Sequence, residues 1–266
     1  MFKSVVPITI EKHGKSKVKT IQNFDYAKNV NMASIMVHEF SRAASIYPIV
    51  FVEDKSKDQF KPVVLLGLEE GENLFVHDEK WEASYIPAII RRYPFALAKT
   101  DEEGRFMVCI DEGSDLVNQE EGQELFQENG EPGELMERVK RYLAELQQMD
   151  KFTEDFCSYL AEKNMFTPLN MKVRLGNEMR NITGAYIINE ERLNSLSGDT
   201  FLEMHAKRYI PVVYSHLSSI SQIERLLNFK EKKVISATEL GEHFGEAVGA
   251  DTKADKAETK AAKSKK

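Results

Sequence analysis

The spacing of apolar residues changes near residue 132, and this change limits the possible folds more than any other feature of the sequence. Before it, several short segments alternate apolar and polar residues with the period of two that is typical of half-buried strands. From 132 to 163 the period becomes 3.6, which predicts one long helix, or two abutting helices with a break near Asp150. The apolar stripe consists of Leu135, Val139, Tyr142, Leu146, Met149, Phe152, Phe156, Tyr159 and Leu160.

Short strands dominate the first half of the chain. Segments 47–53 and 60–68 are predicted to form a hairpin, which a third strand at 73–77 extends into an antiparallel β-meander. The meander is expected to hold about five strands in all. The other predicted elements of this half are strands at 5–10, 17–24, 95–99 and 105–111, turns at 13–15 and 100–104, and a short helix at 34–44.

A second short helix is expected to be inserted into the meander. Ser84 is a suitable N-cap, Pro87 falls in the first turn where its missing N–H costs nothing, and Pro94 ends the helix. Its apolar face would consist of Tyr85, Ile86, Ile89, Ile90 and Tyr93.

The C-terminal third is predicted to be rich in helices. Strands at 169–175 and 181–188 would pair through a turn at 176–178, and Asn189 would cap the first of several helices, with others at 200–208, 210–217 and 219–229. Strands first and helices later, without regular alternation, indicate an α+β fold rather than a doubly wound parallel sheet. We expect residues 1–232 to form a single domain, and 233–266 to be a linker and a disordered tail rich in Lys and Ala.

The net charge of -7 is unevenly distributed along the 266 residues. Residues 101–137 hold thirteen acidic side chains and one basic one, whereas the tail at 251–266 holds six lysines and three acidic residues. The rest of the chain therefore carries a charge near -10, which disfavours nucleic acid as a partner. The basic tail is most simply explained as a solvated, solubilising segment.

Several classes of protein are disfavoured by what the sequence lacks. No apolar run approaches the roughly 20 residues that span a bilayer, so we expect no membrane insertion. The N-terminal segment lacks the features of a signal peptide, which predicts a cytoplasmic location. Cys109 and Cys157 are the two cysteines and form no metal-binding motif. We found no nucleophile elbow and no glycine-rich phosphate loop, and we expect neither a metal nor a cofactor.

One cluster of arginine and aromatic residues could form a binding site. Guanidinium groups lie beside aromatic residues in an otherwise acidic body, a combination that could bind an anion or a peptide. In a competing interpretation, Trp81, Ile86 and Ile90 pack in the core. Arg91 and Arg92 then pair with one of three carboxylates, those of Asp111, Glu112 and Asp115. The candidate binding residues are Trp81, Tyr85, Arg91, Arg92, Tyr93, Asp111 and His77.

The chain resembles the SapC family, bacterial proteins named from surface-layer secretion loci. The resemblance covers roughly residues 7–227, and its most specific part is the aromatic and arginine motif. The matching segments are 47–51 (YPIVF), 65–68 (LLGL), 72–75 (ENLF), Trp81, 85–95 (YIPAIIRRYPF), 110–111 (ID), 122–126 (GQELF), Gly130 and 214–219 (YSHLSS). One position departs from the pattern: Arg208 stands where we expect a glycine before Tyr209, which leaves the local turn open.

This resemblance implies a cytoplasmic accessory protein linked to the export or presentation of surface-layer proteins, and it transfers no catalytic residue. Together with the absence of a catalytic motif, it favours a non-enzymatic protein that binds a protein or peptide partner. The alternative is an enzyme, or an enzyme subunit, that acts on a small anionic molecule. In that case Arg92 would hold the anion, and His77 or Asp111 would act as acid or base.

Overall fold

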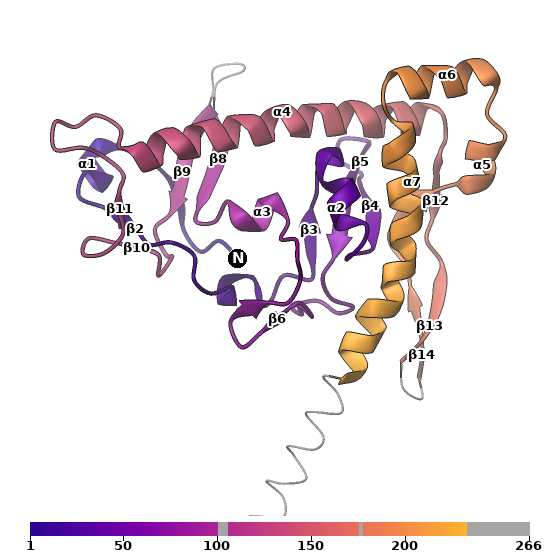
Figure 1. The fold of residues 1–266 in the computed structure, drawn as a ribbon, viewed down its shortest axis with the longest axis horizontal. Helices are drawn as coiled ribbons and strands as arrows, with labels where there is room; N and C mark the ends of the chain where they lie inside the picture. The colour runs from indigo at the N-terminus through magenta and orange to yellow at the C-terminus, as the bar shows by residue number, and fades with distance from the viewer. Residues whose placement is uncertain (101–105, 176–177, 233–266) are drawn as a thin grey trace, which may run out of the picture.

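A computed structural model describes residues 1–100, 106–175 and 178–232 (Figure 1). It confirms the α+β class, with antiparallel sheets, a long central helix and a helical C-terminal part. The predicted tail at 233–266 and most of the predicted turn at 100–104 lie outside the described residues. The extent of the domain, residues 1–232, stays a prediction. No helix in the described ranges is long and apolar enough to cross a membrane.

The strands are short and pair mainly in small antiparallel sheets. They are β1 Val5–Pro7, β2 Lys17–Val18, β3 Met32–Ser34, β4 Ile49–Asp54, β5 Gln59–Leu65, β6 Val76–His77, β7 Lys80–Trp81, β8 Phe95–Lys99, β9 Phe106–Asp111, β10 Val117–Asn118, β11 Gln123–Glu124, β12 Phe166–Pro168, β13 Met171–Leu175, β14 Glu178–Ile182 and β15 Tyr186–Ile188.

The helices differ widely in length. The α-helices are α1 Ile10–His13, α2 Phe40–Ala43, α3 Ala88–Arg91, α4 Glu134–Glu162, α5 Glu190–Asn194, α6 Gly198–Ala206 and α7 Ile210–Ser219. Three 3₁₀ turns are η1 Asp25–Ala27, η2 Val37–Glu39 and η3 Ile220–Gln222, and residues 223–232 continue η3 as a helix.

Helix α4 is a single helix of 29 residues, about 43 Å long at 1.5 Å per residue. The sequence allowed a break near Asp150, but the helix is continuous there. Asp150 lies on the exposed side, and the apolar stripe continues past it. The helix runs across most of the molecule (Figure 1). Its two halves contact different hydrophobic cores.

The larger core lies under the C-terminal half of α4. Phe156 and Leu160 are fully buried there against the five-stranded sheet and α7. The smaller core lies under the N-terminal half, where Leu143 of α4 packs with Phe95 and Ile110 from β8 and β9. Because one rigid helix covers both cores, it fixes their relative positions.

The five-stranded sheet has the order β12-β15-β4-β5-β3. It contains the predicted hairpin, with Ile49 opposite Val64. The predicted third strand of the meander does not join this sheet. Its residues form a turn and then β6, which pairs with β7, while the place beside β5 is taken by β3 from earlier in the chain. The buried side chain of Asn73 explains the turn, since it accepts from the Phe75 N–H and donates to the Ala27 carbonyl.

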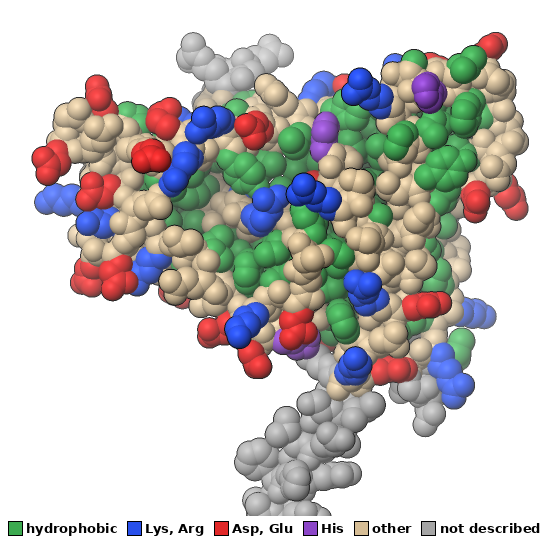
Figure 2. Space-filling view, in the orientation of Figure 1, with side chains coloured by type: hydrophobic (Ala, Val, Ile, Leu, Met, Phe, Trp, Pro, Cys, Tyr) green, Lys and Arg blue, Asp and Glu red, His purple; other side chains and the backbone are tan. Residues whose placement is uncertain are grey.

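The two N-terminal strands are also shorter than predicted and do not pair with each other. β1 pairs with β9, and β2 pairs with β10 and β11. Helix α1 separates them, and Thr9 caps it by accepting from the Lys12 N–H at 3.4 Å. Figure 2 shows acidic side chains at the end of the molecule that carries β10 and β11, with basic side chains interspersed among them. Two lysines from β2 and the residue after it pair with this acidic segment: Lys17 with Glu124 at 3.3 Å and Lys19 with Glu121 at 2.8 Å.

Helix α3 starts later than the sequence predicts, and Ser84 is not its cap. The helix begins at Ala88, after Pro87, whose ψ of 140° is not helical. A carboxylate from a distant segment caps it: Glu39 Oε1 accepts from the Ala88 N–H at 2.8 Å. Glu39 also accepts from the Tyr85 hydroxyl and, through Oε2, from the Met36 N–H at 3.0 Å. One buried side chain thus holds η2 and α3 together.

The turn after α6 has the same backbone geometry that a glycine at position 208 would give it. The Tyr209 N–H donates to the Met204 carbonyl and the Arg208 N–H to the His205 carbonyl, which is the Schellman pattern at a helix end. This pattern requires a positive φ at the residue after the cap, and Arg208 has a φ of 61°. The backbone therefore keeps the geometry that suits a glycine, with an arginine in its place.

His216 of α7 joins three elements of the larger core. It is fully buried, and its Nε2 accepts from the Ile188 N–H of β15 at 3.0 Å. Ser219, one turn later, accepts from the Ile49 N–H of β4 at 3.0 Å. Burial lowers the pKa of His216 from 6.5 to about 3, so the imidazole is neutral in the folded protein.

We expect Glu39→Gln to lower the free energy of unfolding by about 3 kcal/mol, because three buried donors lose a charged acceptor. Urea unfolding would measure the change. Glu145→Gln, an exposed position on α4, is the control and should stay within about 0.5 kcal/mol of wild type. Equal losses in the two variants would contradict the role assigned to Glu39.

We expect Arg208→Gly to raise the free energy of unfolding by about 0.5–1 kcal/mol, since a positive φ strains a residue with a Cβ more than it strains glycine. His205→Gly, inside α6, should instead lower it by a similar amount. Thermal unfolding of both variants tests this pair, and a loss of stability in Arg208→Gly would contradict it.

The stability gap between wild type and His216→Gln should narrow as the pH falls from 6.5 to 4.5. Below pH 6.5 unfolded His216 binds a proton that the folded protein, with a pKa of about 3, does not bind. Its contribution is thus complete above pH 6.5 and falls by up to about 1.4 kcal/mol per pH unit below it. Urea unfolding of both proteins across this range measures the gap, and a constant gap would contradict the assignment.

Candidate functional site

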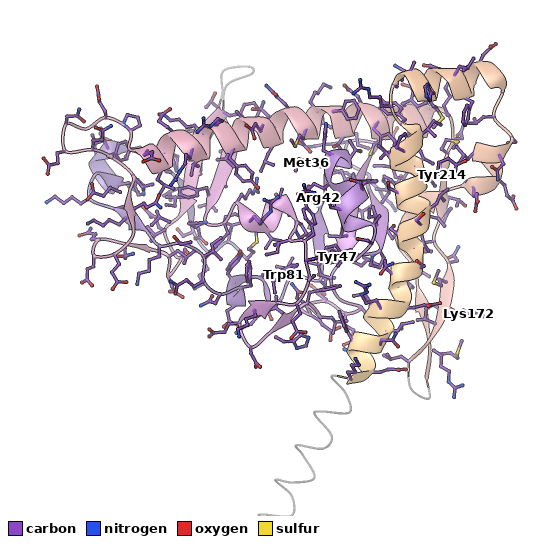
Figure 3. All side chains as sticks on the ribbon, viewed as in Figure 1. Met36, Arg42, Tyr47, Trp81, Lys172 and Tyr214 are labelled. Carbon is purple, nitrogen blue, oxygen red and sulfur yellow. The ribbon has the colours of Figure 1, made fainter. Side chains whose placement is uncertain are left out.

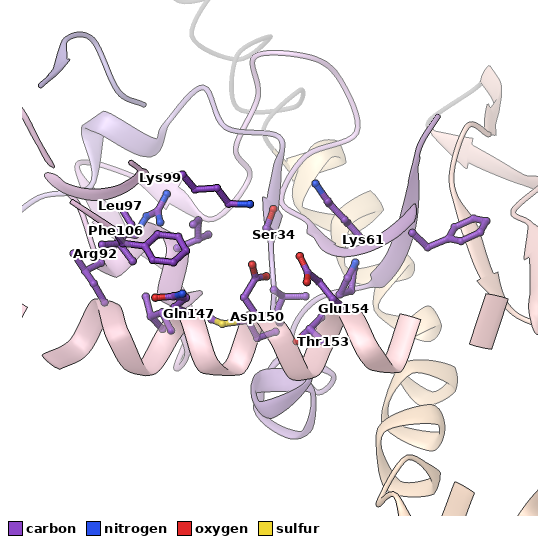
Figure 4. Close-up of a pocket in the computed structure, with 17 residues that line it drawn as sticks. Ser34, Lys61, Arg92, Leu97, Lys99, Phe106, Gln147, Asp150, Thr153 and Glu154 are labelled. Carbon is purple, nitrogen blue, oxygen red and sulfur yellow. The ribbon is translucent and has the colours of Figure 1, made fainter. Parts of the chain in front are cut away.

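A cavity of about 370 Å³ lies where the two cores meet (Figure 4). Ser34, Arg92, Lys99, Phe106, Gln147 and Asp150 are among its lining residues, and we call it the seam cavity. Helix α4 forms one wall, and α3 and the ends of β3, β5, β8 and β9 form the others. Its volume falls in the range of small-molecule and peptide side-chain sites.

The wall formed by α4 follows from the helical period. Leu143, Leu146, Gln147 and Asp150 lie on neighbouring turns and face the cavity together. The apolar members of this face close the floor, while the polar members border it. The cavity exists because α4 bridges two sheets that do not pair with each other.

Arg92 lies at the C-terminal end of α3 and lines the cavity. Its guanidinium carbon is 5.8 Å from the ring centre of Phe2. Burial lowers the pKa of Arg92, against the opposing effects of Tyr142 and Asp150. Its Nε is buried and has no hydrogen-bond partner in the described part of the chain. A cation with so little solvation attracts an anion more strongly than an exposed one does.

The charges around the cavity are not balanced. Lys61 lies 3.5 Å from Asp54, and Glu154 lies 3.8 Å from Lys151. Among the described residues, Arg92 and Lys99 have no carboxylate oxygen within 4.0 Å. Asp150 also lines the cavity, and its charge opposes the fall in the pKa of Arg92, so Arg92 and Lys99 leave one positive charge in excess at the cavity.

Trp81 lies in the larger core rather than in the cavity. It is 9% exposed, and its Nε1 donates to the Tyr47 hydroxyl at 2.8 Å. Tyr47 is fully buried and in turn donates to the Tyr85 carbonyl. Figure 3 shows Trp81 and Tyr47 close together below α3. This chain of hydrogen bonds holds the segment that leads into α3.

Tyr93 and Asp111 are structural neighbours. Tyr93 stacks on Tyr26 with ring centres 4.2 Å apart and donates to Asp111 Oδ2 at 3.3 Å. Asp111 is fully buried and accepts from the N–H groups of Lys3 at 2.9 Å and Ser4 at 2.6 Å. Burial alone would raise the pKa of Asp111, but these hydrogen bonds outweigh it and lower the pKa. Asp111 thus anchors the N-terminal segment.

The remaining candidates lie apart from the cavity wall. Arg91 is exposed, donates through Nε to the Ile86 carbonyl at 2.9 Å, and lies 5.7 Å from the Tyr85 ring centre. The Nε2 of His77 lies 3.1 Å from the Leu74 carbonyl oxygen and 3.9 Å from Glu82. In the described ranges, neither arginine forms the ion pairs with Asp111, Glu112 or Asp115 that the competing interpretation predicts. Of the seven candidates, Arg92 lines the seam cavity.

Sequence reasoning missed the other lining residues because they come from distant segments. Lys99, Phe106 and Gln147 meet only when β8, β9 and α4 are assembled. One signal was present: Gln147, Asp150 and Glu154 border the apolar stripe of the predicted helix at helical spacing.

Two potential nucleophiles on α4, Thr153 and Cys157, are hydrogen-bonded or protonated. Thr153, at the cavity wall, donates to the Met149 carbonyl at 2.8 Å and accepts from the Val37 N–H at 3.1 Å, so its hydroxyl is occupied. Burial raises the pKa of Cys157 to about 12, which keeps its thiol protonated. The described residues contain no group of three His, Cys, Asp or Glu side chains that could hold a metal ion.

Comparison with known proteins gives one match. No curated protein and no solved structure matches the chain. The model of the SapC family matches residues 8–226, a stretch that includes α3, Arg92 and every described wall of the seam cavity. The protein therefore belongs to the SapC family.

Proposed function

We propose that this protein is a non-enzymatic accessory protein that binds a segment of a protein partner in the seam cavity. The observation that carries the proposal is the position of Arg92, a partly desolvated cation without a carboxylate partner in the described residues, at the wall of a largely apolar cavity. Interaction sites are enriched in arginine and aromatic residues of this kind. Three cations and two carboxylates line the cavity, and the partner supplies a further negative charge.

The family gives this binding function a context. Membership of SapC, whose name refers to surface-layer secretion loci, supports a role in the export or presentation of surface-layer proteins in a bacterium. We propose that the protein acts in the cytoplasm, where it would meet its partner before export. The acidic surface around β10 and β11 supports a protein rather than a nucleic acid as that partner.

An enzyme that acts on a small anionic molecule is the second candidate. The cavity volume of about 370 Å³ and the carboxylates of Asp150 and Glu154 opposite Arg92 favour it. Against it, His77 and Asp111, which the sequence offered as acid or base, lie outside the cavity lining. Asp111 is also held in four hydrogen bonds, which lower its pKa and make it a poor proton donor.

Filling the cavity tests the binding function. Gln147→Trp places an indole at the cavity wall and should reduce capture of the partner from native lysate by at least about tenfold. Gln148→Trp is the matched control, because Gln148 is exposed on α4 and does not line the cavity. Quantitative mass spectrometry of the proteins retained by each tagged variant measures the effect.

Equal capture by the two tryptophan variants would contradict a role for the seam cavity. Turnover of a small anion by the wild type, abolished by Gln147→Trp, would favour the enzyme instead. Matching urea unfolding curves for the two variants would show that neither result comes from misfolding.

A further inference from the structure

Two edge strands border the seam cavity, together with α3. β3 is the last strand of the five-stranded sheet, and β8 is the last strand of the three-stranded sheet β1-β9-β8. β3 pairs with β5 on one side and β8 with β9, and within the described residues no strand pairs with their other sides. Ser34 of β3, and Leu97 and Lys99 of β8, line the cavity. An unpaired edge offers N–H and C=O groups to an added strand.

The walls next to these edges combine apolar surface with unpaired positive charge. Phe106 and Leu143 supply apolar surface, and Figure 4 shows Phe106 beside Leu97 and Lys99. Arg92 and Lys99 have no carboxylate within 4.0 Å in the described ranges. Arg92 is half-buried and its Nε has no hydrogen-bond partner in the described residues, and a bidentate carboxylate would offset the cost of this partial desolvation.

We propose that the seam cavity binds an extended peptide segment in which an Asp or Glu side chain is flanked by apolar residues. The segment adds to the free edge of β3 or β8, its apolar side chains contact Phe106 and Leu143, and its carboxylate binds Arg92. This inference rests on the proposed binding function and specifies the chemistry of the partner. A peptide fits better than a small anion because the cavity offers strand edges as well as a cation.

A peptide pool tests this inference directly. The probe is a pool of N-acetylated, C-amidated nonapeptides of Val, Leu and Thr with one central Glu, mixed with a matched pool that has Gln instead. The full-length protein is immobilised, and retained peptides are quantified by mass spectrometry. Wild type should retain Glu peptides about tenfold over Gln peptides, equivalent to about 1.4 kcal/mol.

Neighbouring arginines provide the matched variants. Arg92→Gln should abolish the preference for Glu, while Arg91→Gln, whose side chain is exposed outside the cavity, should keep it. Methylation of the backbone nitrogens next to the central Glu should lower retention by wild type, because a methylated nitrogen cannot donate to a strand edge. Equal urea unfolding curves for the two arginine variants establish that both are folded.

Five outcomes would overturn the inference. A Glu preference that is absent in wild type, or that survives in Arg92→Gln, removes Arg92 as the carboxylate site. Retention that is unaffected by backbone methylation removes strand addition. Displacement of the Glu peptides by octanoate at equal concentration makes the ligand a small anion. If wild type retains no peptide but still captures a protein that Gln147→Trp loses, this inference fails while the binding function stands.

Discussion

The fold depends on one helix that covers two hydrophobic cores. Helix α4 contributes Leu143 and Leu146 to the smaller core and Phe156 and Leu160 to the larger one. The sheets under these cores do not pair with each other, so the helix and the buried segments between them set how the sheets lie. The seam cavity is a consequence of this arrangement, because a straight helix crossing two separate sheets leaves the space between their edges incompletely filled.

Two buried carboxylates, those of Glu39 and Asp111, add further links between segments of the fold. Glu39 accepts a hydrogen bond from Ala88, 49 residues further along the chain, and Asp111 ties the N-terminal residues to β9 and Tyr93. Each satisfies backbone donors that would otherwise be buried without a partner. Arg92 differs from both, because its charge is partly buried and lacks a carboxylate in the described part of the chain. The Nδ1 of His216, a residue that holds the fold, is likewise buried without a hydrogen-bond partner in the described residues, so Arg92 is distinguished by its position at a cavity and not by an unsatisfied atom alone.

Local signals predicted the elements that depend on local interactions. The stripe from Leu135 to Leu160 predicted α4, the alternation in 47–53 and 60–68 predicted the β4-β5 hairpin, and Asn189 caps α5 as expected. Local signals were wrong where a residue from a distant segment sets the boundary of an element. Ser84 was predicted to cap α3, but the helix begins only after Pro87, and Glu39 caps it. The third meander strand was wrong for the same reason, since β3 from earlier in the chain pairs with β5.

The sequence by itself determined the α+β class and the long central helix, because periodicity and residue type are properties of short segments. It also named Arg92 as one of seven candidate binding residues. The sequence could not show which of these candidates line a cavity and which are buried. Trp81, Tyr93 and Asp111 are buried in the folded protein. Only the tertiary structure decided that Arg92 meets Lys99, Phe106 and Gln147 at one cavity. The physical reason is that burial and pairing depend on contacts between segments far apart in the chain, and no local pattern records them.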